Sequence, residues 1–296
     1  MEKQIPQFLK DMLEEQYGEE ITKKIIEGYT KQKYVTLRVN KIKTTVENIK
    51  QQLENNNIKY KEADWYKEAL IIENVREDEI RKMQIYENGD IYLQSLSSML
   101  PPIVLEPNVG ENILDMAAAP GGKTTQIATM TENKSFITAC EKNKIRAERL
   151  KYNLQKQGAT CVNIMTEDAR QLSDYFSFDK ILLDAPCSGS GTENVFDDRF
   201  SKELIQRSCK TQEILLKKAI NILKPGGEMI YSTCSILKRE NEEILNKVLK
   251  KGKIEIVPIK LDKEIPTLPV KVEGTICVLP TELYEGFFVA KIKKIK

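Results

Sequence analysis

Residues 113–124 of the 296-residue chain read ILDMAAAPGGKT and give the clearest indication of its fold. Its apolar start predicts a buried strand, and the small residues that follow predict a turn that opens a helix. Glycine lets a backbone approach a ligand closely, and the free N–H groups at a helix start favour an anionic group. The stretch therefore predicts a ligand-binding loop between a strand and a helix.

After this stretch, apolar β-rich runs alternate with segments of helical period, a pattern typical of βα units on a parallel sheet. The sequence predicts an α/β fold, a doubly wound Rossmann-like domain over residues 108–296. Two further extended runs lie at 253–258 and 286–292, and we expect the last to form an edge strand. The predicted strands are 112–117, 135–140, 160–165, 179–185 and 228–232, and the predicted helices are 124–131, 143–157 and 203–223.

The first 107 residues have a mixed pattern that predicts a small α+β module. Helical stretches lie at 8–17 and 46–56, and strand-like runs lie at 34–39 and 69–73. The window 31–50 holds six basic residues against Glu47 alone, so it is either a local nucleic-acid face or an ordinary solvated face. The whole chain has 46 Lys plus Arg against 44 Asp plus Glu, which argues against a uniformly basic surface.

The composition excludes several classes of enzyme. The chain has no histidine, so it cannot hold a Ser-His-Asp triad or an HExxH zinc site. Its six cysteines are far apart and never form a CxxC pair, so we expect reduced thiols and no metal. No apolar run approaches the ~20 residues of a membrane span. We expect a cytoplasmic protein with no membrane partner, and a monomer.

Three nucleotide ligands compete for the loop at 117–123. A P-loop is one reading of the Gly-Lys-Thr ending, but Ala117 stands where that motif needs glycine, and Pro120 lacks the N–H that would cradle a phosphate. The dinucleotide fingerprint G-x-G-x-x-G is absent. S-adenosylmethionine fits better because it has no phosphate, and a P-loop-like NTPase is the alternative.

Two acids follow successive predicted strands and suit such a cofactor. Glu141 closes the second strand, where a carboxylate can accept from both ribose hydroxyls. Asp168 follows the third strand and can accept from the adenine amino group. An acid at such a position, taken alone, is more often a helix N-cap or a solvated side chain, but the joint placement of the two predicts cofactor contacts.

Two cysteines follow the fourth and fifth predicted strands of the domain. Cys187 lies in DAPCSG at 184–189, and Cys234 lies in YSTCS at 231–235. Both positions fall at the carboxyl edge of the sheet, so we expect the two thiols to be neighbours. The other cysteines, Cys140, Cys161, Cys209 and Cys277, are expected to be small buried hydrophobes.

These segments together resemble the RsmB/Nop/Sun family of RNA cytosine-5 methyltransferases. The likeness covers nearly the whole chain and includes APGGKT at 119–124, DAPCSGSG at 184–191, YSTCS at 231–235 and EGFFVA at 285–290. TLRVN at 36–40 also resembles a segment of the family's amino-terminal RNA-contacting module. The resemblance implies an RNA-binding amino-terminal module at 1–107 and methylation of carbon 5 of a cytosine.

The resemblance also implies residue roles. Cys234 would be the nucleophile that adds to carbon 6 of the base, Cys187 would assist product release, and Asp184 would hydrogen-bond the base. Cys234 needs a depressed pKa, and Lys123 is a candidate local cation. The implied cofactor contacts are Ala117, Ala118, Ala119, Pro120, Gly121, Gly122, Lys123, Glu141, Asp168 and Asp184.

The RNA substrate is predicted only as a class. We favour ribosomal RNA, with transfer RNA as the alternative. The loop 193–199 lacks the basic stretch common in the family, which leaves RNA contacts there open. A catalytically inactive RNA-binding relative is a further alternative, but such a protein should have lost Cys234, which is present.

Overall fold

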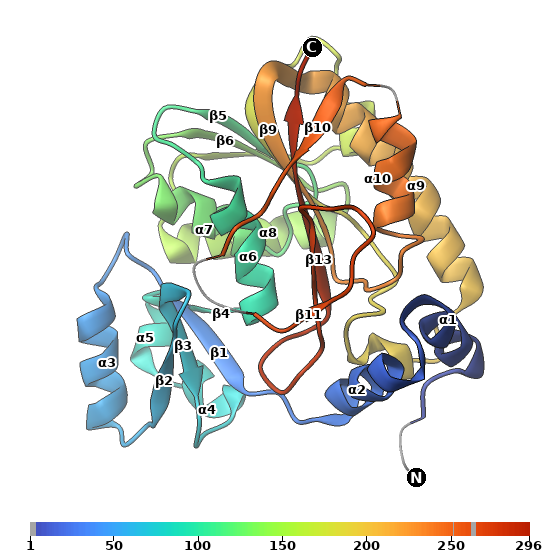
Figure 1. The fold of residues 1–296 in the computed structure, drawn as a ribbon. Helices are drawn as coiled ribbons and strands as arrows, with labels where there is room; N and C mark the ends of the chain where they lie inside the picture. Colours follow the sequence, from blue (N-terminus) through green and yellow to red (C-terminus); the bar gives the residue numbers. More distant parts are fainter. Residues whose placement is uncertain (1–3, 251, 262–264) are drawn as a thin grey trace.

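The structure, a computed structural model, describes residues 4–250, 252–261 and 265–296 and contains two sheets (Figure 1). The larger sheet has nine strands, and five of them run parallel in the order β7-β6-β5-β8-β9. The order reverses between β5 and β8, as it does in doubly wound folds. The predicted fold class is therefore confirmed. The parallel strands are β5 (Asn112–Asp115), β6 (Phe136–Cys140), β7 (Val162–Met165), β8 (Phe178–Asp184) and β9 (Leu223–Thr233).

Helices cover both faces of this sheet because its parallel strands are apolar on both sides. One face packs on α6, α7 and α8 through residues such as Leu100, Ile127 and Leu150. The other face packs on α9 and α10 through residues such as Leu216 and Leu245. These helices are α6 (Leu96–Leu105), α7 (Gly122–Met130), α8 (Lys144–Gln157), α9 (Lys202–Ile222) and α10 (Glu242–Leu249).

The strand β13 (Phe287–Lys294) corrects one prediction. We expected the run 286–292 at the edge of the sheet, but β13 pairs with β9 on one side and with β10 (Ile254–Val257) and β12 (Ile276–Val278) on the other. Its buried apolar run Phe287–Ala290 is the pattern of an interior strand. The strands that cover it are too short to signal this pairing in the sequence. Beyond β12 lies β11 (Thr267–Leu268).

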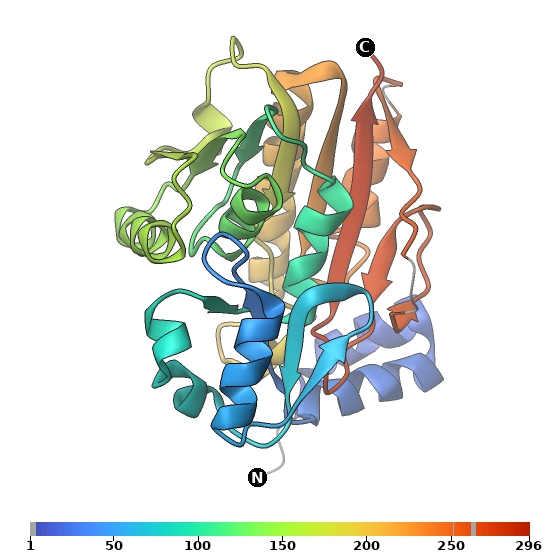
Figure 2. The same ribbon diagram turned by 90° about the vertical axis from the view of Figure 1, so that its left-hand side faces the viewer.

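The second sheet forms the predicted α+β module, with four antiparallel strands in the order β2-β3-β1-β4. It has a hydrophobic core of its own, and Figure 2 shows it as a separate unit beside the large sheet. Its elements are β1 (Val35–Val39), α3 (Val46–Asn55), β2 (Tyr60–Ala63), β3 (Tyr66–Ile72), α4 (Glu77–Arg81), α5 (Gln84–Glu87) and β4 (Ile91–Leu93).

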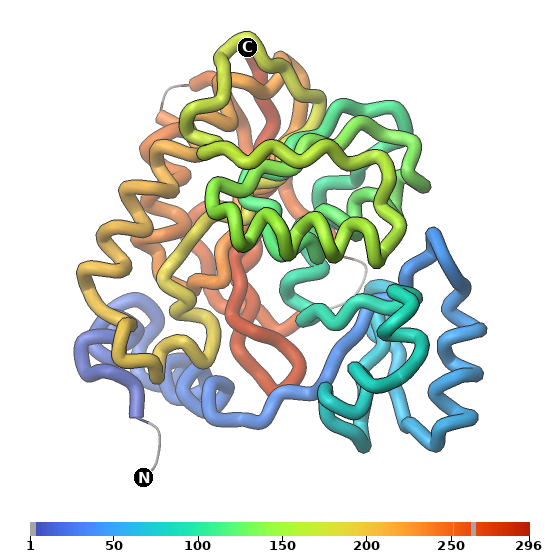
Figure 3. The backbone as a smooth tube through the Cα atoms, turned by 180° about the vertical axis from the view of Figure 1, so that it is seen from behind, coloured from blue at the N-terminus to red at the C-terminus, as the bar shows by residue number. Residues whose placement is uncertain are grey.

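The first two helices, α1 (Gln7–Tyr17) and α2 (Glu19–Thr30), pack away from this module. Leu9 and Leu13 belong to the core of the large sheet, and the ring of Phe8 stacks on Phe200 with centroids 5.9 Å apart. Figure 3 shows these helices beside the start of α9. A domain boundary at residue 107 stays a prediction, since α1, α2 and α6 precede it in the sequence and pack on the large sheet.

A buried arginine joins the module to the large domain. Arg38, in β1, is fully buried, and its guanidinium donates to Gln94 Oε1, Gly122 O and Thr125 Oγ1 at 3.1, 3.2 and 2.9 Å. The last two acceptors lie in the first turn of α7, and Gly122 is also a residue of the predicted cofactor loop. No helix in the described parts of the chain is long and apolar enough to cross a membrane.

Asp115 ends β5 and is a buried acid at the reversal of strand order. Its carboxylate accepts from Thr124 Oγ1 at 2.7 Å and from the Ala117 N–H at 3.4 Å. Burial raises the pKa of Asp115 to about 6, the hydrogen bond from Thr124 opposes this rise, and the charge of Asp184 adds to it. The folded protein therefore holds a proton on Asp115 more tightly than the unfolded chain does.

This difference predicts a pH-dependent stability term. The stabilisation from protonated Asp115 is complete below the unfolded pKa of ~3.9 and is lost as the pH rises through about 6. Between pH 4 and pH 7 the unfolding free energy of the wild type should fall relative to that of Asp115→Asn by about 2 kcal/mol. Urea unfolding of both proteins across this range measures the difference, and a constant difference would contradict it.

Candidate active site

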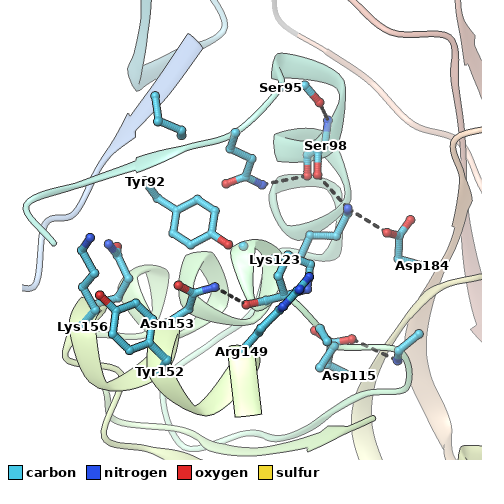
Figure 4. Close-up of a pocket in the computed structure, with 18 of the residues that line it drawn as sticks. Tyr92, Ser95, Ser98, Asp115, Lys123, Arg149, Tyr152, Asn153, Lys156 and Asp184 are labelled. Atoms are coloured by element: carbon cyan, nitrogen blue, oxygen red, sulfur yellow. Dashed lines mark hydrogen bonds and ion pairs between the residues drawn. The ribbon is translucent and has the colours of Figure 1, made fainter. Parts of the chain in front are cut away.

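A cleft of about 1020 Å³ opens at the carboxyl ends of β5 and β8, next to the amino-terminal module. It is lined by the small residues of the loop after β5, by acids from both strand ends, by Cys234, and by cations and aromatic rings from α8 and the module (Figure 4). Among these residues are Ala117, Ala118, Ala119, Pro120, Gly122, Lys123, Asp115, Asp184, Tyr92, Arg149, Tyr152 and Lys156.

Lys123 and Asp184 form an ion pair inside the cleft. The Lys123 ammonium lies 2.7 Å from Asp184 Oδ2 and donates to Ser98 Oγ at 2.7 Å (Figure 4). The other oxygen of Asp184 accepts from Ser232 Oγ at 2.8 Å. We expected Lys123 to serve as the local cation for Cys234. In this structure its ammonium is instead engaged by a carboxylate and a hydroxyl.

The two cysteines meet, as their positions after β8 and β9 predict. Cys187 Sγ and Cys234 Sγ are 3.0 Å apart, although 47 residues separate them in the sequence. Both side chains are half-buried, and Cys234 lines the cleft. The contact with Cys234, burial, and the nearby charge of Glu240 raise the pKa of Cys187 well above its ordinary value. Cys187 is therefore a thiol that keeps its proton.

Backbone pairing holds the loops of the two cysteines together. The Gly191 N–H donates to the Cys234 carbonyl at 2.9 Å, and Ser190 Oγ and Ser235 Oγ are 2.7 Å apart. The Gly191 carbonyl also accepts from the Gly286 N–H at 2.7 Å. A Cβ at Gly191 would lie 2.0 Å from the Gly286 carbonyl oxygen, so this close approach requires glycine.

Glu141 and Asp168 lie at the ends of β6 and β7 but are not among the residues that line this cleft. Glu141 is buried and accepts from the Asn143 N–H at 2.8 Å, with Arg146 Nη1 at 3.3 Å from its other oxygen. Asp168 pairs with Arg170, whose hydrogen bonds lower the pKa of Asp168. Their contacts with a cofactor stay predictions, as do those of Gly121, which precedes α7 with φ 109°.

The basic window 31–50 is largely occupied by internal partners. Lys31 pairs with Glu282, Lys41 with Glu68, and Lys50 with Glu62. The remaining cations are Arg38, which is buried, and Lys33 and Lys43, which donate to backbone carbonyls. These contacts favour a structural function for the window over a continuous nucleic-acid face.

Cations and tyrosines instead gather where the module faces α8. The Lys156 ammonium lies 3.8 Å from the centroid of the Tyr86 ring and 5.9 Å from that of Tyr152. The Arg81 guanidinium also lies over the Tyr86 ring, 5.2 Å from its centroid. Bases can stack on such rings while cations contact phosphates.

Asp115, Ser98 and Glu240 are among the residues of the site that the sequence does not predict. Asp115 lies within residues 113–124, where the apolar pattern predicts only a strand. No sequence pattern around Ser98 indicates its contact with Lys123. Glu240 is fully buried behind the cysteines, six residues after Cys234, and no pattern there predicts burial. Within the described ranges, no group of three or more Cys, Asp or Glu side chains could hold a metal ion.

Comparison with known proteins identifies the family. Residues 102–293 match the family described as 16S rRNA methyltransferase RsmB/F, and residues 5–77 match the ferredoxin-like domain of RsmF/B-like methyltransferases. The chain is 34% identical over 274 residues to the tRNA (cytosine(49)-C(5))-methyltransferase of Pyrococcus abyssi, covering 88% of each protein. It is 36% identical over 223 residues to the tRNA (cytosine(72)-C(5))-methyltransferase of Pyrococcus horikoshii.

That second match covers 73% of this chain and 56% of the relative, so the chain spans little more than half of that protein. A crystal structure of a methyltransferase homologue from Pyrococcus horikoshii superimposes with a TM-score of 0.84 at 30% identity, covering 98% of this chain and 100% of the other. The match at residues 102–293 contains both cysteines and the loop after β5. The resemblance seen in the sequence is thus confirmed, and the chain belongs to the RsmB/F methyltransferase family.

Proposed function

We propose that this protein transfers a methyl group from S-adenosylmethionine to carbon 5 of a cytosine in structured RNA. The observation that carries this proposal is the 3.0 Å contact between Cys187 and Cys234 beside the Lys123–Asp184 pair. Relatives named as cytosine-C5 methyltransferases of ribosomal and transfer RNA support it. Ribosomal RNA is the favoured substrate, and transfer RNA is the alternative.

Carbon 5 of cytosine is too weak a nucleophile to react alone, so covalent catalysis is needed. The Cys234 thiolate adds to carbon 6 of the base, and the electron pair of the broken double bond becomes available at carbon 5. S-adenosylmethionine supplies the electrophilic methyl group when it is bound. A water molecule then takes the proton from carbon 5, and the electron pair of that C–H bond re-forms the double bond between carbons 5 and 6. The bond from carbon 6 to sulfur breaks, so Cys234 leaves as a thiolate and the aromatic ring returns.

The loop after β5 has the character that this cofactor needs. Ala117, Ala118 and Ala119 line the cleft with small side chains, so a ligand can approach their backbone closely. The start of α7 follows directly and favours a carboxylate. Glu141 and Asp168, at the next two strand ends, would accept from the ribose and the adenine.

Asp184 and Cys187 would support the chemistry from either side of Cys234. Asp184 accepts a hydrogen bond from the protonated ring nitrogen or the amino group of the base, while Lys123 and Ser232 hold its carboxylate in place. Cys187 keeps its proton and lies in contact with Cys234. It can therefore donate that proton to the sulfur that leaves the base.

The same contacts argue against the two other functions. A P-loop lysine must reach phosphates, whereas the Lys123 ammonium is held by Asp184 and Ser98. An inactive relative has no need of two touching thiols beside a cleft. A cytoplasmic location and a monomeric state stay predictions, and RNA contacts at the loop 193–199 stay open.

Ligand binding separates the methyltransferase from the NTPase. We expect saturable binding of S-adenosylmethionine to the full chain, because the loop offers backbone and a helix start without a phosphate cradle. Isothermal titration calorimetry with S-adenosylmethionine and with Mg-ATP measures both. Binding of ATP without binding of S-adenosylmethionine would favour the NTPase.

Cys234→Ala should abolish methyl transfer while leaving cofactor affinity within about twofold, because the loss is confined to the nucleophile. The substrate is total RNA from cells that lack the gene, with tritiated S-adenosylmethionine as donor. Cys161→Ala is the matched control, since it removes a half-buried thiol that does not line the cleft. Substantial turnover by Cys234→Ala would remove Cys234 from the nucleophilic role.

Cys187→Ala should instead trap the RNA on the protein, because the leaving thiolate loses its proton donor. A denaturing gel should show a retarded covalent protein–RNA band that the wild type does not accumulate. The double variant Cys187→Ala/Cys234→Ala should lack the band, which assigns the bond to Cys234. Normal turnover by Cys187→Ala without a band would disprove this division between the thiols.

A further inference from the structure

Glu240 is a fully buried acid in the turn between Cys234 and α10. It does not line the cleft, and no ion pair with a Lys or Arg of the described chain involves it. A buried carboxylate without a cation must be stabilised by hydrogen bonds. The residues that donate those hydrogen bonds connect Glu240 to the loops of the two cysteines.

Four donors surround the carboxylate. Oε1 accepts from the Ser188 N–H at 2.8 Å and from Gln212 Nε2 at 3.2 Å. Oε2 accepts from Ser188 Oγ at 2.5 Å and from Ser235 Oγ at 2.6 Å. An ionised carboxylate offers about four acceptor positions and no donor. The four donors therefore match the ionised form and occupy all of its acceptor positions.

These donors lie next to the two reactive sulfurs. Ser188 directly follows Cys187, and Ser235 directly follows Cys234. Gln212 also donates to the carbonyl of Pro186, which directly precedes Cys187, at 3.0 Å. One carboxylate therefore binds both cysteine loops within one residue of each sulfur.

The hydroxyl network has a fixed direction because each hydroxyl has one proton. Ser235 gives its proton to Glu240, so Ser190 must donate to Ser235 across their 2.7 Å contact. Ser190 Oγ in turn accepts from the Ile236 N–H at 3.1 Å. The side chain of the neighbouring Asn241, by contrast, accepts from Thr233 Oγ1 and donates to the Ser235 carbonyl, both in the Cys234 turn.

We propose that Glu240 is a positioning residue that holds the thiols of Cys187 and Cys234 in contact by tying their two loops to one carboxylate. It acts from behind the cleft and touches neither base nor cofactor. After the contact with Cys234 and burial, the charge of Glu240 adds to the rise of the Cys187 pKa, which helps that thiol keep its proton. The catalytic part of this inference rests on the proposed function, and the geometric part does not.

The geometric part is tested without any substrate, by cross-linking the two thiols. Diamide takes one hydrogen from each thiol, becomes the corresponding hydrazine, and leaves the sulfurs joined as a disulfide. Mass spectrometry of the peptide pair that holds Cys187 and Cys234 gives the rate. Glu240→Gln keeps the size of the side chain but turns one acceptor oxygen into a donor that faces two hydroxyls, so the rate should fall about tenfold.

Glu242→Gln is the matched control. Glu242 is also buried, lies two residues further on, and accepts from the Lys271 N–H without touching either cysteine loop. The Glu242→Gln protein should cross-link within about twofold of the wild-type rate, since the hydrogen bonds between Glu240 and the two cysteine loops are intact. An unchanged rate in a folded Glu240→Gln protein would overturn the proposal, and so would an equal fall in Glu242→Gln.

Ser188→Ala and Ser235→Ala keep the inference falsifiable if Glu240→Gln does not fold. Each removes one hydroxyl from the same carboxylate and leaves the other three donors. Each should slow cross-linking about threefold. Wild-type rates in both variants would overturn the proposal.

Methyl transfer tests the catalytic part. With RNA from cells that lack the gene, Glu240→Gln should lower kcat about tenfold and leave the KM for S-adenosylmethionine within about twofold, because Glu240 lies outside the cleft. A raised KM with unchanged kcat would overturn the positioning role. If the wild type itself transfers no methyl group, the proposed function fails while the diamide experiment still decides the role of Glu240.

Discussion

The reversal of strand order between β5 and β8 is the constraint on which the site depends. It leaves a crevice at the carboxyl ends of these strands, and the chain delivers its reactive groups there from separate segments. The loop after β5 brings Lys123, the end of β8 brings Asp184 and Cys187, and the end of β9 brings Cys234. Parallel pairing of β8 with β9 keeps these ends level, so the two sulfurs meet.

The site stabilises its negative charges in two different ways. Asp184 faces the cleft and is balanced by the Lys123 ammonium, so it can exchange one partner for a base. Glu240 lies behind the cysteines and is held by four neutral donors, a set with no room for another partner. One carboxylate is arranged for contact with a ligand, and the other for holding the backbone that presents the thiols.

Much of this arrangement follows from local sequence. Strands buried on both faces read as continuous apolar runs, so β5 to β9 and the loops after them could be predicted, and with them the meeting of Cys187 and Cys234. Features that depend on residues far apart in the sequence could not be predicted. The interior position of β13 depends on its pairing with the short strands β10 and β12. The burial of Glu240 depends on donors from two other segments, the Cys187 loop and α9.

Arg38 gives the amino-terminal module a structural role in the catalytic domain. Its guanidinium donates to Gly122 and Thr125 in the first turn of α7, while Gln94 holds it from the module side. The cofactor loop is therefore braced by a residue that belongs to another folding unit. A Rossmann-like domain cut free of the module would keep every reactive side chain but would lose the two hydrogen bonds that Arg38 donates to the start of α7. The two units have separate sheets and cores, yet a residue of one holds the start of the cofactor-side helix in the other.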